Sequence, residues 1–406
     1  MKIIQANKFY FPKGGADIYA LQLSDLLRAH GHEVIPFAMR HRENLSTPYE
    51  KYFVSEVNLR KREGMLSNLK KFGRVVYSFE ARRKFSQLLR DTKPDVVHIH
   101  NIYHQLSPSV LHAAAAARVP VVMTVHDYKL FNPNYSMFGH GGAVCEHGKN
   151  ERYWETMRYN CMGSHGASFT VAVEAYLHRW LGTYKKHVAR FISPSTFMID
   201  LAVDWGWERS RFVRITNFVQ PIMPPKKRGK ECIIYVGRLS VEKGLAYLLE
   251  AAKMVAPIPV VLVGRGPEED ALRSFAGELG LKNVTFAGFK SGAELWSMIA
   301  GARAVVLPTV SYENAPLAVL EAQMLGRVVI ATRVGGIPEL VSDGENGFIV
   351  PPRDSLALGK AIERVWHMRA DERGAMEGLA RERVLREHDA EDHVRRIVAV
   401  YKSIIS

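Results

Sequence analysis

Two glutamates, Glu313 and Glu321, stand in the stretch SYENAPLAVLEA with seven residues between them. A carboxylate accepts hydrogen bonds and donates none, so it holds neighbouring hydroxyls well. Two carboxylates at this spacing therefore suit two sugar rings of one ligand. The alternative, if the pair is considered without the rest of the sequence, is that both glutamates are ordinary charged surface residues. The surrounding chain is basic, with a formal net charge of +14. That charge indicates an anionic partner and leaves nucleic acid, acidic lipid and phosphate-bearing small molecules open.

Two cations follow a predicted strand in the stretch YVGRLSVEKGLAYLLEAA. Gly237 ends the strand, Arg238 and Lys243 lie in the turn, and a helix is expected to begin near Leu245. A guanidinium binds a diphosphate through paired hydrogen bonds, an ammonium adds a mobile point charge, and a helix start favours anions. The stretch predicts a phosphate site, and a solvated charged loop is the alternative.

A glycine pair, Gly14 and Gly15, leads from the first predicted strand into a helix in FPKGGADIYALQLSDLLRAHGHEV. Paired glycines let the backbone approach a ligand closely, and the free N–H groups of a helix start favour an anion. A strand-to-helix turn also needs glycine for geometry alone. This motif alone therefore fits both an anion-binding site and a glycine that the turn requires.

Short β-branched runs alternate with amphipathic helical stretches through the whole chain, which predicts an α/β fold of two doubly wound parallel sheets. The strands expected in the first half are at 2–6, 33–39, 95–101, 120–127 and 190–195. The strands expected in the second half are at 232–239, 259–266, 283–289, 304–309 and 328–332.

A chain of 406 residues is long enough for two domains, and a proline-rich basic stretch at 217–231 interrupts the periodicity as a linker does. We predict an acceptor-side domain at 1–224, a donor-binding domain at 225–385, and a C-terminal helix at 386–406 that packs back on the first domain. Ligands of open parallel sheets lie beyond the carboxyl ends of the strands, so two such domains facing each other are expected to form one cleft.

The order of these motifs resembles the retaining glycosyltransferases of family 4. The matching motifs are Gly-Gly after the first strand, GRLSVEKG, ENAPLAVLEA and VGGIPELVSDGENGFIVPP, and they span nearly the whole chain. The family pattern of two glutamates with seven residues between them matches Glu313 and Glu321 without a gap. The resemblance implies the GT-B fold, in which two Rossmann-like domains face each other across a cleft.

The resemblance also implies a nucleotide-diphosphate-sugar as co-substrate. Arg238 and Lys243 would bind its diphosphate, Glu313 the hydroxyls of its sugar and Glu321 its ribose, while loops 264–269 and 287–290 would surround the base. The donor-binding residues implied are Gly14, Gly15, Gly237, Arg238, Lys243, Gly264, Phe289, Lys290, Glu313, Asn314, Ala315, Pro316, Leu317 and Glu321.

The residues after the first glutamate depart from the commonest family pattern. Many members have Gly-Phe-Gly there, whereas this chain has Asn314, Ala315 and Pro316. The variant resembles a subgroup common among bacterial polysaccharide enzymes and leaves the donor sugar open. Locally, we expect Asn314 to cap the following helix and Pro316 to lie in its first turn.

A strand-end histidine in TVHDYKLFNPN, His126, completes the catalytic set that the resemblance implies with Glu313, Arg238 and Lys243. An imidazole can donate to a sugar hydroxyl without becoming a nucleophile. The acceptor-side candidates are His100, Asn101 and Asp127. The sequence has no Asp-x-Asp motif at a strand end, and we expect neither a catalytic metal nor a cofactor.

The three cysteines, Cys145, Cys161 and Cys232, are too few and too widely spaced for a disulfide framework and fit a reducing compartment. Cys145 and Cys161, together with His147 and His165, offer four ligands for a structural zinc at irregular spacing. An acceptor-side loop with reduced cysteines is the alternative.

The stretch from Arg60 to Arg90 is dense in cations and carries apolar residues at helical spacing. A helix with this pattern either lies on an anionic membrane surface or packs on the first domain with a solvated basic face, and both readings stay open. The apolar positions are Leu66, Leu69, Phe72, Val76, Phe79 and Leu88. The N-terminus has too short an apolar run for a secretory signal, and we expect a cytoplasmic protein, peripheral on the inner face of the plasma membrane.

These observations favour a retaining glycosyltransferase that moves a sugar to a glycan acceptor, lipid-linked if the membrane reading holds, in the synthesis of a cell-surface polysaccharide such as a lipopolysaccharide or exopolysaccharide. A nucleotide-sugar epimerase or hydrolase of the same fold is the second hypothesis. A nucleic-acid-binding protein is the third, but the interleaved aromatic and basic residues of known modules are not evident. Donor sugar, base, acceptor, linkage and oligomeric state stay open.

Overall fold

The computed structural model of the protein describes residues 1–57, 64–139, 141–223, 225 and 229–405, except for the side chains of residues 65–70. The chain forms two compact units. The first unit runs from Met1 to Ile215 apart from residues 142–144 and takes in the C-terminal segment from Glu391. The second unit comprises residues 142–144 and 216–390.

The first unit is built on a parallel sheet whose six described strands follow the order β2-β1-β3-β4-β5-β6. The central strands β3 and β4 are buried along their whole length, as expected for a parallel sheet covered on both faces. The strands are β1 (Lys2–Ala6), β2 (Glu33–Phe37), β3 (Val96–Ile99), β4 (Val121–Thr124), β5 (Arg190–Ser193) and β6 (Phe212–Arg214).

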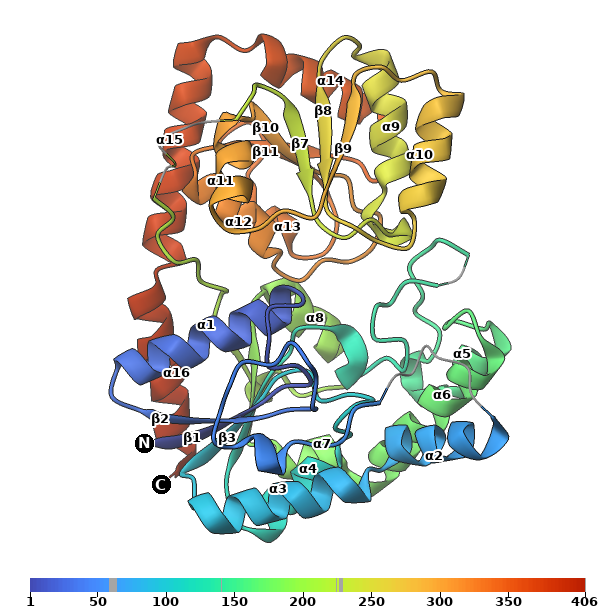
Figure 1. Ribbon diagram of the computed structural model, residues 1–406, viewed down its shortest axis with the longest axis vertical. Helices are drawn as coiled ribbons and strands as arrows, with labels where there is room; N and C mark the ends of the chain where they lie inside the picture. Colours follow the sequence, from blue (N-terminus) through green and yellow to red (C-terminus); the bar gives the residue numbers. More distant parts are fainter. Residues whose placement is uncertain (58–63, 140, 224, 226–228, 406) are drawn as a thin grey trace. The chain divides into compact units, whose positions relative to one another are not determined.

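Helices lie on both sides of this sheet. Figure 1 shows α3 and α4 side by side on one side of the strands, with α1 and α16 on the other. Serine caps fix two of the helix starts, because Ser78 accepts from the Ala81 N–H and Ser195 accepts from the Met198 N–H. The helices of this unit are α1 (Gly15–Ala29), α2 (Met65–Val76), α3 (Phe79–Thr92), α4 (Ser109–Ala116), α5 (Trp154–Arg158), α6 (His165–Leu181), α7 (Thr183–His187), α8 (Thr196–Asp204) and α16 (Ala390–Ile405), with short 3-10 turns η1 (Glu50–Tyr52), η2 (Tyr128–Leu130), η3 (Lys149–Glu151) and η4 (Arg209–Arg211).

The C-terminal helix α16 belongs to the core of the first unit. Its Ile397 and Tyr401 are fully buried, and the Tyr401 hydroxyl lies 2.6 Å from Nδ1 of His98 on β3. About two turns earlier, Nε2 of His393 is hydrogen-bonded to the Tyr19 hydroxyl of α1 at 2.9 Å. Helix α16 is thus hydrogen-bonded to strand β3 and to helix α1.

The second unit repeats the plan, and its six described strands follow the order β12-β11-β10-β7-β8-β9. Ile233 and Tyr235 of β7 pack into the core on one face of the sheet, whereas Ile234 between them packs into the core on the other face. This alternation is the period-two pattern of a strand buried on both sides. The strands are β7 (Ile233–Val236), β8 (Val260–Val263), β9 (Val284–Gly288), β10 (Ala304–Leu307), β11 (Val328–Thr332) and β12 (Gly347–Val350).

Seven helices of the described chain complete the second unit. They are α9 (Leu245–Met254), α10 (Glu269–Glu278), α11 (Gly292–Gly301), α12 (Leu317–Met324), α13 (Ile337–Leu340), α14 (Ser355–His367) and α15 (Ala370–Glu387), and the turn η5 (Val241–Lys243) precedes α9. The predicted α/β fold of two doubly wound parallel sheets is confirmed, and each of the ten predicted strands overlaps an observed one. The edge strands β6 and β12 were not predicted.

The described part of the basic stretch, residues 64–90, forms α2 and most of α3. The apolar side of α3 is packed inside the first unit, since Leu88 is fully buried, and Val76 at the end of α2 is buried as well. Phe79 is 76% exposed, and the side chains of Leu66 and Leu69 lie outside the described residues. Within the described part of the chain, no helix combines the length and apolarity needed to cross a bilayer.

Replacing Tyr401 with Phe is expected to lower the free energy of unfolding by about 1–3 kcal/mol, because Nδ1 of the buried His98 ring loses its hydrogen-bond partner. Equilibrium urea unfolding measures the change. Tyr159→Phe is the control, since Tyr159 is half exposed, and it is expected to stay within about 0.5 kcal/mol of the parent. Equal stability of Tyr401→Phe and the parent would show that the hydroxyl does not anchor α16.

Candidate functional site

An ion pair in the second unit joins two of the predicted site residues. The Lys243 ammonium of η5 contacts Oε1 of Glu313 in the loop after β10, and the two side chains are 29% and 18% exposed. Burial by itself lowers the pKa of Lys243, but the Glu313 carboxylate more than offsets this and raises it above its ordinary value. Lys243 is therefore a fixed cation beside a fixed carboxylate.

Backbone contacts hold the two loops of this ion pair together. The carbonyl of Glu242 accepts from the Val310 N–H at 2.9 Å and from the Thr309 hydroxyl at 2.8 Å. Gly244 ends η5 in the left-handed region with φ of 66°, and a Cβ there would lie 2.1 Å from the Pro308 carbonyl oxygen. Only glycine permits this close approach, so Gly244 sets the position of Lys243.

The stretch after β11 packs against the backbone of Glu313. The Gly336 N–H donates to the Glu313 carbonyl at 2.7 Å, and a Cβ on Gly335 would lie 2.1 Å from the same oxygen. The sequence motif that contains these glycines was part of the resemblance, but the residues were not assigned a role. The structure shows that they hold the backbone of Glu313.

A second cation lies in the turn that carries Lys243. Arg238 is exposed, and in the described part of the chain its guanidinium makes no ion pair or hydrogen bond. Its positive charge acts on Lys243, and the buried Tyr235 hydroxyl donates to its carbonyl at 2.8 Å. The turn therefore presents one unpaired guanidinium next to the ammonium.

The glycines at the strand ends are packed backbone to backbone. The Gly237 N–H donates to the Val263 carbonyl at 3.0 Å, and the Gly264 N–H donates to the Gly288 carbonyl at 2.8 Å. These contacts bring the carboxyl ends of β7, β8 and β9 to one edge of the sheet. Phe289, the next residue along, is 65% exposed, whereas Lys290 forms a surface ion pair with Glu294 at 2.5 Å.

Helix α12 begins two residues later than a cap at Asn314 predicts. Pro316 occupies the position before the helix with an extended backbone, and Leu317 is the first helical residue, so the expected cap at Asn314 is wrong. The fixed φ of proline allows this sharp entry without a capping side chain. Asn314 is buried instead, and the Ala315 carbonyl accepts from the Asn217 side chain at 2.8 Å.

Glu321 lies on α12, about one turn after its first residue, Leu317. Its carboxylate has no hydrogen bond or ion pair to another described residue, and burial raises its pKa to about 7. An unpaired, partly buried carboxylate gains from a ligand that donates hydrogen bonds to it.

The first unit gathers the predicted histidines. Nε2 of His126, at the end of β4, is hydrogen-bonded to Nδ1 of His100 at 3.0 Å. Burial and the nearby Lys8 lower the pKa of His126 to about 3, so its ring is neutral. Asn101 follows His100 in the chain, and its carbonyl accepts from the Lys8 N–H at 2.8 Å. These residues form one cluster at the carboxyl ends of β3 and β4.

Asp127 and the glycine pair complete the predicted residues of this unit. Asp127 accepts from the Lys129 N–H at 3.1 Å, and burial raises its pKa to about 6. Gly14 and Gly15 are exposed, and α1 begins at Gly15 as expected. His98 and His393 extend the histidine cluster, and neither was predicted. For His98, the His-x-His spacing of His98 and His100 was the available signal.

The four proposed zinc ligands do not come together. Sγ of Cys145 lies 2.9 Å from Sγ of Cys161, but His147 stacks on Tyr159 and pairs with Glu155, and His165 starts α6. Over the described ranges, no three His, Cys, Asp or Glu side chains are grouped as metal ligands require. The structure therefore supports the alternative of a loop with free cysteines.

Family models match both units of the chain. Residues 13–221 match the model described as Glycosyltransferase Family 4, and residues 221–383 match the model described as Glycosyl transferases group 1. The chain belongs to glycosyltransferase family 4. It is therefore a retaining, metal-independent glycosyltransferase, and the family predicted from the motifs is confirmed.

Curated relatives of this glycosyltransferase include enzymes of bacterial glycan synthesis. The alpha-D-kanosaminyltransferase of Streptomyces kanamyceticus is 36% identical over 33% of this chain and 36% of the relative. The putative colanic acid biosynthesis glycosyltransferase WcaL of Escherichia coli is 34% identical over 40% of this chain and 42% of the relative. An uncharacterized glycosyltransferase of Methanocaldococcus jannaschii is 25% identical over 90% of this chain and 89% of the relative.

Solved structures share the fold of the glycosyltransferase. HepE of Anabaena in complex with UDP and glucose has a TM-score of 0.70 at 17% identity and covers 99% of this chain and 100% of its own. Sucrose-phosphate synthase of Thermosynechococcus elongatus has a TM-score of 0.73 at 19% identity over 99% of this chain and 98% of its own. The predicted GT-B fold is thereby confirmed.

The unpaired carboxylate of Glu321 predicts a pH-dependent stability. Because its folded-state pKa of about 7 lies above the ordinary 4.5, the folded state binds the proton more tightly, and stability is lost as the pH rises from 4.5 through 7. Glu321→Gln is expected to be more stable than the parent at pH 8, by up to about 3 kcal/mol, and equally stable at pH 4. Urea unfolding at both pH values measures the difference.

Glu278→Gln is the matched control, since Glu278 is exposed on α10 and is expected to change nothing at either pH. A Glu321→Gln variant that is less stable than the parent at pH 8 would contradict a carboxylate without partners.

Proposed function

We propose that the protein transfers a sugar from a nucleoside diphosphate sugar, with UDP as the first nucleotide to test, to the glycan acceptor of a cell-surface polysaccharide. The observation that carries the donor class is the Lys243–Glu313 ion pair with Arg238 beside it. A diphosphate needs the two cations, and a sugar ring needs the carboxylate. In a nucleotide sugar the diphosphate is bonded directly to the sugar ring, so one ligand carries both groups.

In the proposed reaction, the bond between the anomeric carbon and the diphosphate breaks while a bond to the acceptor hydroxyl forms on the same face. Arg238 and Lys243 offset the charge that develops on the leaving diphosphate. Glu313 holds hydroxyls of the donor sugar, and Glu321 holds the ribose. A phosphate oxygen of the leaving group takes the proton of the acceptor hydroxyl.

His126 fits a hydrogen-bonding role in this scheme. Its low pKa keeps the imidazole neutral, and one ring nitrogen is occupied by His100. A neutral imidazole can hydrogen-bond to a sugar hydroxyl and orient it, but it does not act as a general acid at neutral pH. We therefore assign His126 to orienting the sugar, with His100 as its support and Asn101 and Asp127 on the acceptor side.

The polysaccharide role draws on the relatives, among them the O-antigen chain mannosyltransferase C of Escherichia coli, 33% identical over 141 residues. A lipid-linked acceptor at the cytoplasmic face of the membrane fits the exposed side of α6. Phe169, Tyr176 and Trp180 lie on one face of that helix, at intervals of seven and four residues, and all are exposed. Exposed aromatic side chains of this kind lie well in a membrane interface.

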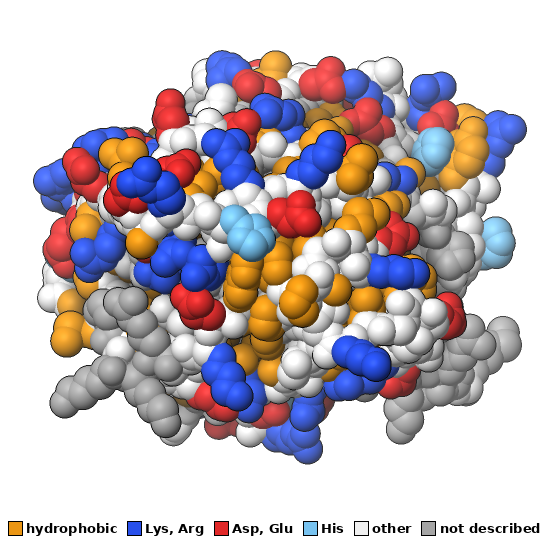
Figure 2. All heavy atoms as spheres, turned by 90° about the horizontal axis from the view of Figure 1, so that it is seen from above, with side chains coloured by type: hydrophobic (Ala, Val, Ile, Leu, Met, Phe, Trp, Pro, Cys, Tyr) orange, Lys and Arg blue, Asp and Glu red, His pale blue; other side chains and the backbone are white. Residues whose placement is uncertain are grey.

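The nucleic-acid alternative receives no support from the surface in Figure 2. On the face shown there, Lys and Arg side chains are interspersed with Asp and Glu side chains, and no continuous basic field covers it. A nucleic-acid-binding surface concentrates its cations on one face or stripe.

UDP-sugars are expected to raise the melting temperature of the protein, because a ligand that binds only the folded state stabilises it by mass action. Arg238→Ala and Lys243→Ala are each expected to weaken this binding at least about tenfold, the cost of a charge-assisted hydrogen bond. Thermal shift titrations with UDP-, GDP- and ADP-sugars measure the effect. Lys253→Ala, which removes an exposed lysine at the end of α9, is the control and is expected to bind like the parent.

Two results would contradict the proposal. Stabilisation by no nucleotide sugar would remove the donor assignment. Release of nucleotide at the same rate with and without an added glycan lipid would indicate the hydrolase or epimerase hypothesis in place of transfer.

A further inference from the structure

A cavity with an enclosed volume of about 60 Å³, in part open to solvent, lies inside the first unit, and none of its lining residues belongs to the donor motifs. Its lining comes from the chain after η2, from η3, from the second half of α6, from α7 and from the residues that follow α8. A ligand larger than a few water molecules would therefore occupy the open part of the cavity as well as its enclosed part. Nothing in the donor site uses these residues.

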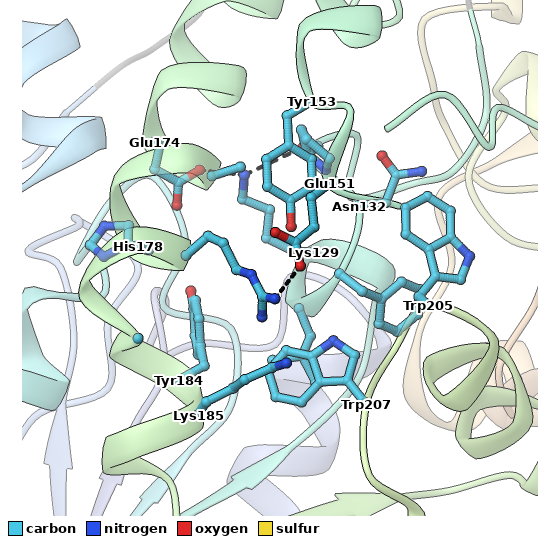
Figure 3. Close-up of a pocket in the computed structure, with 16 residues that line it drawn as sticks. Lys129, Asn132, Glu151, Tyr153, Glu174, His178, Tyr184, Lys185, Trp205 and Trp207 are labelled. Carbon is cyan, nitrogen blue, oxygen red and sulfur yellow. Dashed lines mark hydrogen bonds and ion pairs between the residues drawn. The ribbon is translucent and has the colours of Figure 1, made fainter. Parts of the chain in front are cut away.

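Aromatic side chains form much of the wall. Figure 3 shows Trp205 and Trp207 on one side of the cavity, with Glu174 and His178 of α6 on the other. Tyr153 and Tyr184 reach into the space between them, with their hydroxyls toward its centre. Phe131 packs against Trp205 at 5.6 Å between ring centroids, which holds the indole in place.

Two polar groups of the lining lack hydrogen-bond partners among the described residues. They are the Tyr184 hydroxyl and the Trp205 Nε1–H, and both atoms are buried. Tyr184 as a whole is only 9% exposed. A buried polar group without a partner costs free energy, so an occupant that bonds to it, with a small adjustment of the lining, would be favoured.

Ion pairs supply charged donors and acceptors at two depths. The Lys129–Glu174 pair is buried, with side chains 3% and 2% exposed, and fixes the wall on the α6 side. The Arg179–Glu151 pair is more exposed, with side chains 36% and 51% exposed, and both residues line the cavity. Such a pair offers N–H donors and carboxylate acceptors side by side.

We propose that this cavity binds a sugar residue of the acceptor glycan, as a site apart from the one that carries out transfer. The assignment to the acceptor rests on the proposed function. The C–H face of a pyranose ring packs on indole and phenol rings, and its hydroxyls both donate and accept. Glu151 and Arg179 match that mixture, and Tyr184 and Trp205 add the two unpartnered donors.

Other ligand classes fit the lining less well. An acyl chain would leave the buried tyrosine hydroxyl and indole N–H without partners. A phosphate group needs uncompensated cations, but Lys129 and Arg179 are each paired with a carboxylate. Lys185 is the exception, and it lies 5.3 Å from the centre of the Trp207 ring, where it would meet an acidic substituent of a sugar.

An oligosaccharide array of bacterial capsular and lipopolysaccharide fragments tests this assignment with the full-length protein, followed by calorimetric titration of the strongest binder. We expect at least one fragment to bind, and Trp205→Ala and Glu151→Ala to weaken it at least tenfold. Glu151 is exposed, so its replacement keeps the fold if Trp205→Ala does not. The control is Leu356→Ala, which removes a 56% exposed leucine of α14 outside the cavity and is expected to change nothing.

The outcomes separate this inference from the proposed function. If no fragment binds, or if both cavity variants bind like the parent, the cavity is not a glycan site, whatever the nucleotide titrations show. If a fragment binds through these residues while no nucleotide sugar stabilises the protein, the cavity assignment stands and the transfer reaction does not.

Discussion

The contact between Lys243 and Glu313 is the constraint on which the proposed donor site of the second unit depends. It joins the turn after β7 to the loop after β10, so two neighbouring strand ends present a cation and a carboxylate at one point. Gly244 and Gly335 make this possible, because any Cβ at either position would meet a carbonyl oxygen. The pair also explains how a chain of net charge +14 keeps a carboxylate here, since the neighbouring ammonium stabilises it.

Much of the fold could be predicted because its strands are short β-branched runs between glycine and proline breaks. The strands that were missed, β6 and β12, are the last in their sheets and have only three and four residues. A sequence reveals strands as runs of about four to eight apolar residues. β6 is shorter than that, and β12 lies between turn residues, with Asn346 before it and Pro351 after it. The cap at Asn314 was missed for a local reason, since Pro316 fixes the entry into α12 without a side-chain acceptor.

The proposed donor residues could be named from sequence because Arg238, Lys243, Glu313 and Glu321 lie in short motifs that follow β7 and β10. The residues that hold the backbone of Glu313 could not be predicted, since Gly335 and Gly336 act through backbone contacts that depend on tertiary structure. The cavity of the first unit could not be predicted either. Its walls come from five segments between residues 129 and 207, and no local spacing links Glu151 to Trp205.

The central claim is that Lys243 binds the diphosphate and Glu313 binds the donor sugar. Calorimetric titration with UDP, which lacks the sugar, tests it directly in Lys243→Ala and Glu313→Ala. We expect Lys243→Ala to weaken UDP binding at least about tenfold, because the diphosphate loses a charged partner. Glu313→Ala is expected to bind UDP as well as the parent or better, because it frees the ammonium, yet to lose sugar transfer. Equal weakening of UDP binding in both variants would contradict the account, because it would show that the ion pair only holds the loops together.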